Sequence, residues 1–315
     1  MNFSNDNNLS HDFEVKLERY LRRYCSGAMP AKLEEAIIDA TLSAGGRLRP
    51  SLCLCVARSY DQGYDEELAL ASALAVELIH CASLVHDDLP CFDDASTRRG
   101  KPSVHVRYGE STAVLTGDGL IVMAFEVLIR ATTPSGRNLR VLELLADSVG
   151  PLAGIIAGQA WEAEKNIDLY NYHQAKTASL FEFAAMAGAV AAGQEDRTWR
   201  DFGRAVGLAY QTADDLADEA GASGKLGKPT GQDYMHRRPK AVHSSGIRGA
   251  LLSLEEALKQ ARLVIPDHCD QKIAASWLLE LRHRMLAWFQ DESSTAVVPR
   301  RSASVCGKTV LPRLL

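Results

Sequence analysis

Apolar residues recur at helical spacing through most of this chain, and that pattern limits the fold more than any other feature. Residues 31–43 are one example, with apolar side chains at i, i+3, i+4 and i+7 in Leu33, Ala36, Ile37 and Ala40. Further segments rich in Ala and Leu cover residues 66–87, 111–131, 138–164, 173–193, 198–219, 250–263 and 271–290. Alternating runs of β-branched residues are few, and aromatic residues make up only 7% of the chain, which disfavours long strands. We therefore predict an all-α, single-domain bundle of roughly ten or more helices.

Helical periodicity fades at both ends of the 315-residue sequence. Residues 1–11 are rich in Asn and Ser, and residues 291–315 gain Ser, Pro and Arg. Chain ends of this composition are commonly poorly ordered. We predict one domain over residues 12–290, with flexible tails at residues 1–11 and 291–315.

The charge balance excludes several classes of partner. The net charge is −5 and the pI is about 6.0, whereas duplex binders usually have a clustered basic face and a high pI. No uncharged stretch reaches the roughly 20 apolar residues that span a bilayer, and the polar N-terminus resembles no signal sequence. The seven cysteines are scattered without a CxxC pair. We predict a cytoplasmic protein with free thiols, no nucleic-acid partner and no stable membrane insertion.

Two aspartate clusters carry the strongest chemical signal. DDLPCFDD at residues 87–94 and DDLAD at residues 214–218 each follow a long apolar segment. One such cluster alone is usually a solvated loop or helix cap. Two clusters of carboxylates repel one another unless a cation lies between them, and hard oxygen ligands suit magnesium that also binds phosphate. We therefore predict a site for magnesium.

The spacing within each cluster predicts its local geometry. Asp214 and Asp218 are one helical turn apart and share a face. Asp87 and Asp93 are six residues apart and point to different sides of an ideal helix. Pro90 lacks the amide that would bond back to the carbonyl of His86, so we expect a distorted turn that brings Asp93 back to Asp87.

Basic residues lie where a polyanion needs them. Arginine forks match the oxygens of a diphosphate better than a point charge does. Each basic pair alone is typical of a solvated surface, but together with the acidic clusters they indicate a magnesium–diphosphate site. The basic residues concerned are Arg47, Arg49, Arg98, Arg99, Lys101, Lys225, Lys228, Arg237 and Arg238.

These motifs resemble those of a known family, the trans-isoprenyl diphosphate synthases, also called polyprenyl synthetases. DDLPCFDD looks like the first aspartate-rich motif in its DDxxxxD form, and DDLAD looks like the second. Lys176-Thr177 and Gln211 match the KT pair and the glutamine of the family, and GKPTGQD at residues 227–233 resembles the motif that follows. The motifs occur in the family's order.

The resemblance extends over most of the chain, from Leu33 to Met285. It is greatest to bacterial geranylgeranyl diphosphate synthases of the carotenoid-pathway type, in the segment from Asp87 to Glu126. Membership implies an isoprenoid synthase fold around a deep central cavity, usually in a homodimer. It also implies condensation of an allylic diphosphate with isopentenyl diphosphate, and three magnesium ions between the aspartate motifs and the allylic diphosphate.

The resemblance also implies roles for single residues. The metal would be held by Asp87, Asp93 and Asp214, with Asp88, Asp215 and Asp218 as ligands or as supports of the ligands. The allylic diphosphate would be held by Arg98, Lys176, Gln211 and Lys228, and isopentenyl diphosphate by Arg47, His80 and Arg99. Thr177 and Gln211 would place dipoles near the carbocation.

The chain departs from the family pattern at two positions. The common pattern GGKRLRP reads AGGRLRP here, so Gly46 stands where the lysine for isopentenyl diphosphate would be. The lost charge predicts weaker binding of that substrate. Arg238 also stands where many members have lysine.

Product length is predicted from the residues four and five positions before Asp87. In the resembling family these residues form the floor of the cavity, and here they are Ser83 and Ala82. Both are small, whereas farnesyl-forming relatives usually carry an aromatic ring at one of the two positions. We therefore expect geranylgeranyl diphosphate as the product.

Three other interpretations stay open at this point. A farnesyl diphosphate synthase would share every motif except the small floor residues. A non-catalytic subunit of a heteromeric prenyltransferase usually lacks intact aspartate motifs, and both are complete here. A terpene cyclase usually replaces the second cluster with an Asn/Ser/Glu pattern, which DDLAD does not match.

Overall fold

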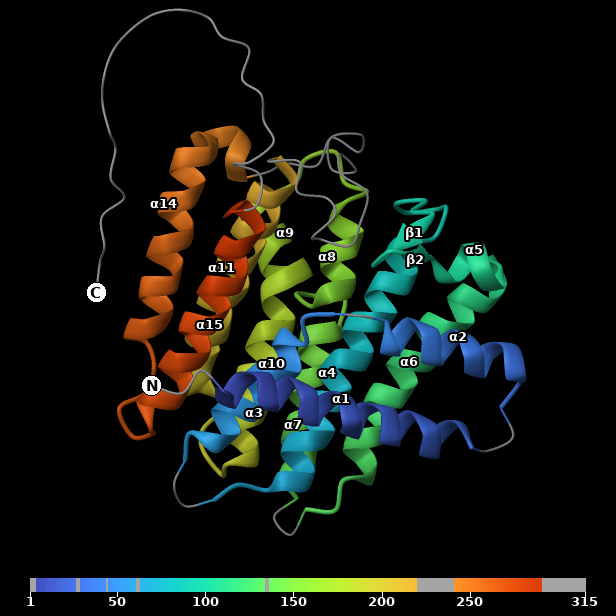
Figure 1. Ribbon diagram of the computed structural model, residues 1–315, viewed down its shortest axis with the longest axis horizontal. Helices are drawn as coiled ribbons and strands as arrows, with labels where there is room; N and C mark the ends of the chain where they lie inside the picture. Colours follow the sequence, from blue (N-terminus) through green and yellow to red (C-terminus); the bar gives the residue numbers. More distant parts are fainter. Residues whose placement is uncertain are drawn as a thin grey trace, which may run out of the picture.

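A computed structural model describes residues 4–26, 29–43, 45–60, 63–133, 136–219 and 241–290. This part of the chain is mostly helical, which confirms the all-α prediction (Figure 1). The helices are α1 (Ser4–Cys25), α2 (Ala31–Leu42), α3 (Leu48–Arg58), α4 (Glu66–Asp87), α5 (Val104–Tyr108), α6 (Glu110–Arg130), α7 (Arg137–Val149), α8 (Ile155–Trp161), α9 (Leu169–His173), η1 (Gln174–Ala178), α10 (Ser179–Ala191), α11 (Arg197–Glu219), α14 (Ala241–Leu263) and α15 (Gln271–Gln290). Two-residue strands β1 (Thr97–Arg98) and β2 (Lys101–Pro102) form one antiparallel pair.

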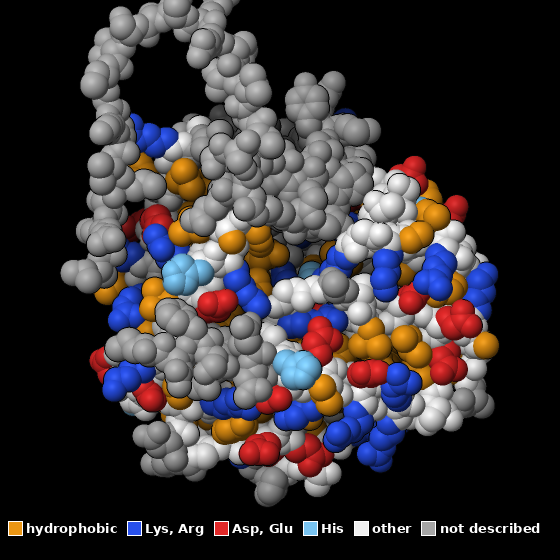
Figure 2. Space-filling model, viewed as in Figure 1, with side chains coloured by type: hydrophobic (Ala, Val, Ile, Leu, Met, Phe, Trp, Pro, Cys, Tyr) orange, Lys and Arg blue, Asp and Glu red, His pale blue; other side chains and the backbone are white. Residues whose placement is uncertain are grey.

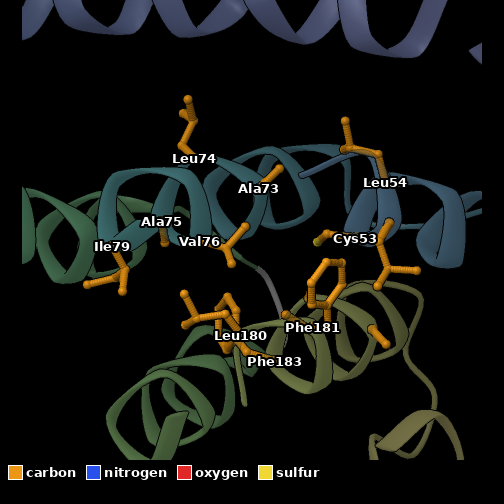
Figure 3. Close-up of a cluster of buried hydrophobic side chains, with 14 of the residues drawn as sticks. Cys53, Leu54, Ala73, Leu74, Ala75, Val76, Ile79, Leu180, Phe181 and Phe183 are labelled. Carbon is orange, nitrogen blue, oxygen red and sulfur yellow. The ribbon is translucent and has the colours of Figure 1, made fainter. Parts of the chain in front are cut away.

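Helix α4 lies at the centre of the bundle, with α3, α6 and α10 packed against it (Figure 1). Its apolar residues cover nearly the whole circumference, as expected of a helix that is buried on all sides. Val76 and Ile79 of α4 face Phe181 and Phe183 of α10 in the cluster shown in Figure 3. This core fixes the C-terminal end of α4, where the first aspartate cluster begins.

Local sequence signals explain where several helices begin and end. The side chain of Asp65 accepts a hydrogen bond from the amide of Leu68 at 2.9 Å and caps the N-terminus of α4. The segment predicted over residues 138–164 is divided into α7 and α8, because Gly150 and Pro151 interrupt the helix between them. The six described cysteines are free thiols, as predicted.

Helix α1 extends beyond the N-terminal boundary that was predicted for the domain at residue 12. Helix α1 begins at Ser4, and Leu9 is buried in the same core as Phe13. The sequence from Leu9 onward therefore supplies apolar anchors that the Asn-rich composition concealed. The tail predicted at residues 291–315 lies outside the described residues.

Two helices, α4 and α6, are long and apolar enough to cross a membrane by length and composition. The apolar window of α4 is 83% buried inside the protein, so its composition reflects a core position. The corresponding window of α6 is only 39% buried.

Figure 2 shows Lys and Arg side chains interspersed with Asp and Glu over the described part of one face, in keeping with the small net charge.

Candidate active site

The first aspartate cluster folds back on itself at the end of α4. The amide of Asp93 donates to the carbonyl of Asp87 at 2.9 Å, and the amide of Ala95 donates to the carbonyl of Asp88 at 3.2 Å. Pro90 has no amide with which to continue the helix, so the chain turns at that point. The expected turn that returns Asp93 to Asp87 is confirmed.

The second cluster lies on α11 and is joined to the KT pair by hydrogen bonds. The hydroxyl of Thr177 donates to Oε1 of Gln211 at 2.5 Å, and Nε2 of Gln211 donates to Oδ1 of Asp215 at 2.8 Å. Nε2 of His173 lies 4.0 Å from the other oxygen of Asp215. The hydrogen bond from Gln211 orients the Asp215 carboxylate, and the His173 ring lies beside its other oxygen.

The KT pair connects the two aspartate clusters. Lys176 and Thr177 lie on η1, a π-helical turn, and turns of this kind are frequent at functional sites. Nζ of Lys176 is 4.0 Å from Oδ2 of Asp87, while the neighbouring Thr177 reaches the second cluster through Gln211. Gly158 allows α8 to approach this turn, because a Cβ there would lie 2.3 Å from the Cα of Lys176. The structure thus brings three separate predicted motifs to one place.

The carboxylates of the two aspartate clusters differ in their hydrogen-bond partners. Asp88 is buried and accepts from Nε of Arg98 at 2.9 and 3.2 Å, and from Nη2 of the same fork. Burial raises the pKa of the Asp88 carboxyl, although the hydrogen bonds from Arg98 oppose the rise. Asp88 and Arg98 are therefore paired with each other, which is compatible with the supporting role that the resemblance left open for Asp88. The assignment of Arg98 to the allylic diphosphate stays a prediction.

The remaining donor set fits magnesium that arrives with a phosphate. Asp87, Asp93, Asp214 and Asp218 are carboxylates, the ligands that magnesium prefers. Among the described residues, no three His, Cys, Asp or Glu side chains are grouped closely enough to hold a cation by themselves. Oxygens from a diphosphate would complete such a coordination sphere.

Arg47 does not fit its expected role at isopentenyl diphosphate. Its side chain is 1% exposed, and its Nε donates to Oε1 of Glu14 at 2.6 Å while its Nη1 pairs with Glu77. Nη2 donates to the carbonyls of Thr41 at 2.9 Å and Ser43 at 3.3 Å. These contacts occupy the guanidinium group, so Arg47 fastens the loop before α3 to α1 and α4.

Arg49, two residues later, lies in a different environment. Its side chain is buried with the guanidinium carbon 4.6 Å from the ring centroid of Phe181, and its Nε has no hydrogen-bond partner among the described residues. Its charged or titratable neighbours are Tyr210, Glu77, Arg99, Asp214 and His80. Burial, followed by the charges of Arg49 and Arg99, holds the pKa of His80 well below its ordinary value. The lowered pKa favours the neutral imidazole, which adds no charge to this arginine cluster.

A cavity of about 370 Å³ lies beside the first cluster, within the size range of ligand pockets. Both predicted floor residues line it, with Ala82 1% and Ser83 7% exposed. The other walls are mostly aliphatic, from α4, α6, α7 and α8: Ile79, Ile121, Val149, Ile155, Ile156 and Ala160. The lining suits a hydrocarbon chain.

Two residues beside Asp87 were not predicted from the sequence. Nε2 of Gln159 donates to Oδ1 of Asp87 at 3.0 Å and to the carbonyl of Ser83 at 3.2 Å. Glu162, one turn later, pairs with Lys176 and accepts from the hydroxyl of Tyr172 at 2.7 Å. Their only sequence signal is the i, i+3 spacing of two polar residues where α8 ends.

Several expected site residues lie outside the described residues. These are Lys225, Lys228, Arg237 and Arg238, together with the GKPTGQD segment. The assignment of Lys228 to the allylic diphosphate stays a prediction.

The fold and site define an α-helical protein with two aspartate motifs connected through the KT pair, a basic cluster and an apolar cavity. The polyprenyl synthetase family model matches residues 30–272, and the chain belongs to that family. It is 50% identical over 257 residues to geranylgeranyl diphosphate synthase from Cereibacter sphaeroides, covering 81% of this chain and 88% of the relative. It is 44% identical over 275 residues to geranylgeranyl diphosphate synthase from Rhodobacter capsulatus, covering 87% and 94%.

A solved structure also shares the fold. The geranyltransferase from Helicobacter pylori, complexed with magnesium and isoprenyl diphosphate, matches with a TM-score of 0.71 and 28% identity. The match covers 91% of this chain and 98% of that chain.

Proposed function

We propose that the protein is a geranylgeranyl diphosphate synthase that condenses an allylic diphosphate with isopentenyl diphosphate. The observation that carries this proposal is the connection of both aspartate motifs through the KT pair, next to an aliphatic cavity that is lined by the small residues Ala82 and Ser83. The names of the two bacterial relatives support the same product. The intact aspartate motifs favour an active enzyme over a non-catalytic subunit.

The two diphosphates would bind on opposite sides of the reacting carbons. We assign the allylic diphosphate to the side of Lys176 and Asp87, with up to three magnesium ions held by Asp87, Asp93, Asp214 and Asp218. The solved relative with magnesium and isoprenyl diphosphate supports the choice of metal. We assign isopentenyl diphosphate to the cluster of Arg49, Arg99 and His80, with Arg49 in place of the Arg47 that the sequence suggested.

The reaction needs charge stabilisation followed by exclusion of water. Magnesium, when bound, neutralises the diphosphate that leaves as the allylic C–O bond breaks. Lys176 adds a fixed positive charge to that leaving group, and the oxygens of Thr177 and Gln211 direct dipoles toward the delocalised cation. The aliphatic cavity keeps the cation from water until the double bond of isopentenyl diphosphate forms the new C–C bond. One proton is then lost, and the released diphosphate is a suitable acceptor.

Product sizing tests this proposal directly. Purified protein is incubated with isopentenyl diphosphate, magnesium and dimethylallyl, geranyl or farnesyl diphosphate, and the dephosphorylated products are separated by chain length. We expect a twenty-carbon product that disappears when EDTA removes the metal. Accumulation of a fifteen-carbon product would instead identify a farnesyl diphosphate synthase. Absence of elongation with every primer would contradict the proposal.

We further propose that the protein is a cytoplasmic homodimer in which α6 packs against its copy. Leu115, Val122 and Ile129 recur every seven residues on α6, and they are 57%, 62% and 62% exposed. A stripe with this period is typical of helix-to-helix packing. The same exposed stripe accounts for the low burial of an otherwise apolar helix.

A charge placed in this stripe is expected to separate the dimer. Val122→Glu should convert a dimeric elution mass to a monomeric one in light scattering, because a carboxylate is costly to bury at an apolar interface. Val106→Glu, at a similarly exposed valine on α5, should leave the mass unchanged. An unaltered mass for Val122→Glu would place the interface elsewhere.

A further inference from the structure

An arginine of the last described helix contacts the loop before α3, in which Gly46 stands at the family's lysine position. Nη1 of Arg284 on α15 donates to the carbonyl of Gly46 at 3.0 Å. Helix α15 packs against α3, and Gly46 lies in the loop that precedes α3 (Figure 1). The contact joins two residues 238 positions apart in the sequence.

A second guanidinium group lies against the neighbouring residue of the same loop. A Cβ at Gly45 would lie 2.8 Å from the central carbon of the Arg99 guanidinium, so glycine leaves room for that side chain in its present position. Nη1 of Arg99 donates to the carbonyl of Ser43 at 3.2 Å. The Gly45-Gly46 pair therefore has one guanidinium group at each residue.

The charges around this loop are predominantly positive. Arg49 is buried nearby, and its Nε has no hydrogen-bond partner among the described residues. The acidic groups near these arginines are few: Glu280 lies 3.5 Å from Nε of Arg284, and Asp214 lies near Arg49. Glu77 is already paired with Arg47. Such an excess of guanidinium groups suits a polyanion such as diphosphate.

We propose that Arg284 supplies the cation that Gly46 lacks at the isopentenyl diphosphate site. This inference rests on the proposed function. The bond to the Gly46 carbonyl anchors the guanidinium at the loop, and the planar fork carries further N–H groups for the diphosphate oxygens. The Arg284 side chain is 33% exposed and is therefore accessible to a ligand. An arginine from the other end of the chain thus replaces the local lysine, and binding of isopentenyl diphosphate is not weakened.

The test compares Michaelis constants for the two substrates. Arg284→Ala should raise KM for isopentenyl diphosphate by about ten- to a hundredfold, the range expected on losing a hydrogen bond to a charged group. KM for the allylic diphosphate should change less than about twofold, because that substrate binds at the metal side. Calorimetric titration with isopentenyl diphosphate alone should show the same loss of affinity. Arg282→Ala is the matched control, because Arg282 lies on the same helix and pairs with exposed Glu255.

Rescue by lysine distinguishes diphosphate binding from a purely structural contact. A Cβ at Gly46 would meet only Leu48, at 3.5 Å, so a side chain fits there. Gly46→Lys should leave KM for isopentenyl diphosphate nearly unchanged in the parent, but should restore it in the Arg284→Ala background. Arg284→Gln retains a donor for the Gly46 carbonyl without the charge. It replaces Arg284→Ala in the comparison of KM values if Arg284→Ala lowers the melting temperature.

Each outcome is decisive. An unchanged KM in folded Arg284→Ala and Arg284→Gln would overturn the inference, as would an equal effect of Arg282→Ala. A raised KM that Gly46→Lys does not lower would assign Arg284 to holding the loop and would also overturn it. An inactive parent enzyme would contradict the proposed function itself, whereas an active parent with an unaffected Arg284→Ala variant would contradict this inference alone.

Discussion

Asp214→Asn is expected to lower kcat by about 10²–10³, and Asp87→Asn by a similar factor. Each change removes one negative charge from a carboxylate that we assign to magnesium, and loss of one transition-state contact of about 3–4 kcal/mol has an effect of this size. The fold should persist, because neighbouring carboxylates repel one another when no cation is present. Steady-state kinetics with saturating magnesium and both substrates measure the effect.

The control uses an aspartate on the same helix as Asp214. Asp201 also lies on α11, but its side chain is 69% exposed and 3.7 Å from Arg204. Asp201→Asn should leave kcat unchanged, and circular dichroism should show the same helix content for all three variants. Near-parent turnover in Asp87→Asn or Asp214→Asn would contradict the assignment of that residue to the metal.

The fold and both aspartate motifs could be predicted because their signals are local. Apolar residues at helical spacing predicted α4, α6 and α11 to within a residue or so of the observed ends. The return of Asp93 to Asp87 followed from Pro90, since a missing amide acts within one turn of the chain. The magnesium site, which was inferred from the electrostatic cost of clustered carboxylates, stays a prediction.

The choice between Arg47 and Arg49 could not be made from the sequence. Arg47 comes just before α3 and has φ of +47°, so helical periodicity does not determine the direction of its side chain. Its direction is fixed by Glu14 and Glu77, which come from two other helices. The proline that follows Arg49 marks a first helical turn but gives no sign that Arg49 points inward.

Contacts between residues far apart in the sequence likewise could not be predicted from the sequence. Arg284 reaches Gly46 only because α15 packs against α3, and no spacing along the chain connects the two. Gln159 reaches Asp87 across the cavity in the same way. Residues of this kind become visible only when the packing of the helices is known.

Ala82→Tyr is expected to shift the product from geranylgeranyl toward farnesyl diphosphate. Ser83 and Ala82 lie four and five residues before Asp87, about 6–8 Å along α4 from the metal side, and both line the cavity. The growing chain is held by its diphosphate at the aspartates, so it must extend past these residues. A phenol ring fills that path, and a close-packed interior has little volume with which to move aside. Chromatography of the dephosphorylated products measures the shift.

Controls must show that the size of the new side chain, and not destabilisation of α4, causes the change in product length. Overpacking a core position costs about 1–3 kcal/mol, so thermal unfolding of Ala82→Tyr should be compared with that of the parent. Ala82→Leu should give an intermediate product distribution at lower cost, and Ser83→Ala, which adds no bulk, should leave the product length unchanged. A folded, active Ala82→Tyr variant with the parent's products would place the floor on the opposite wall, where Ile121, Val149 and Ile155 lie. The small residues of α4 would then no longer support a twenty-carbon product.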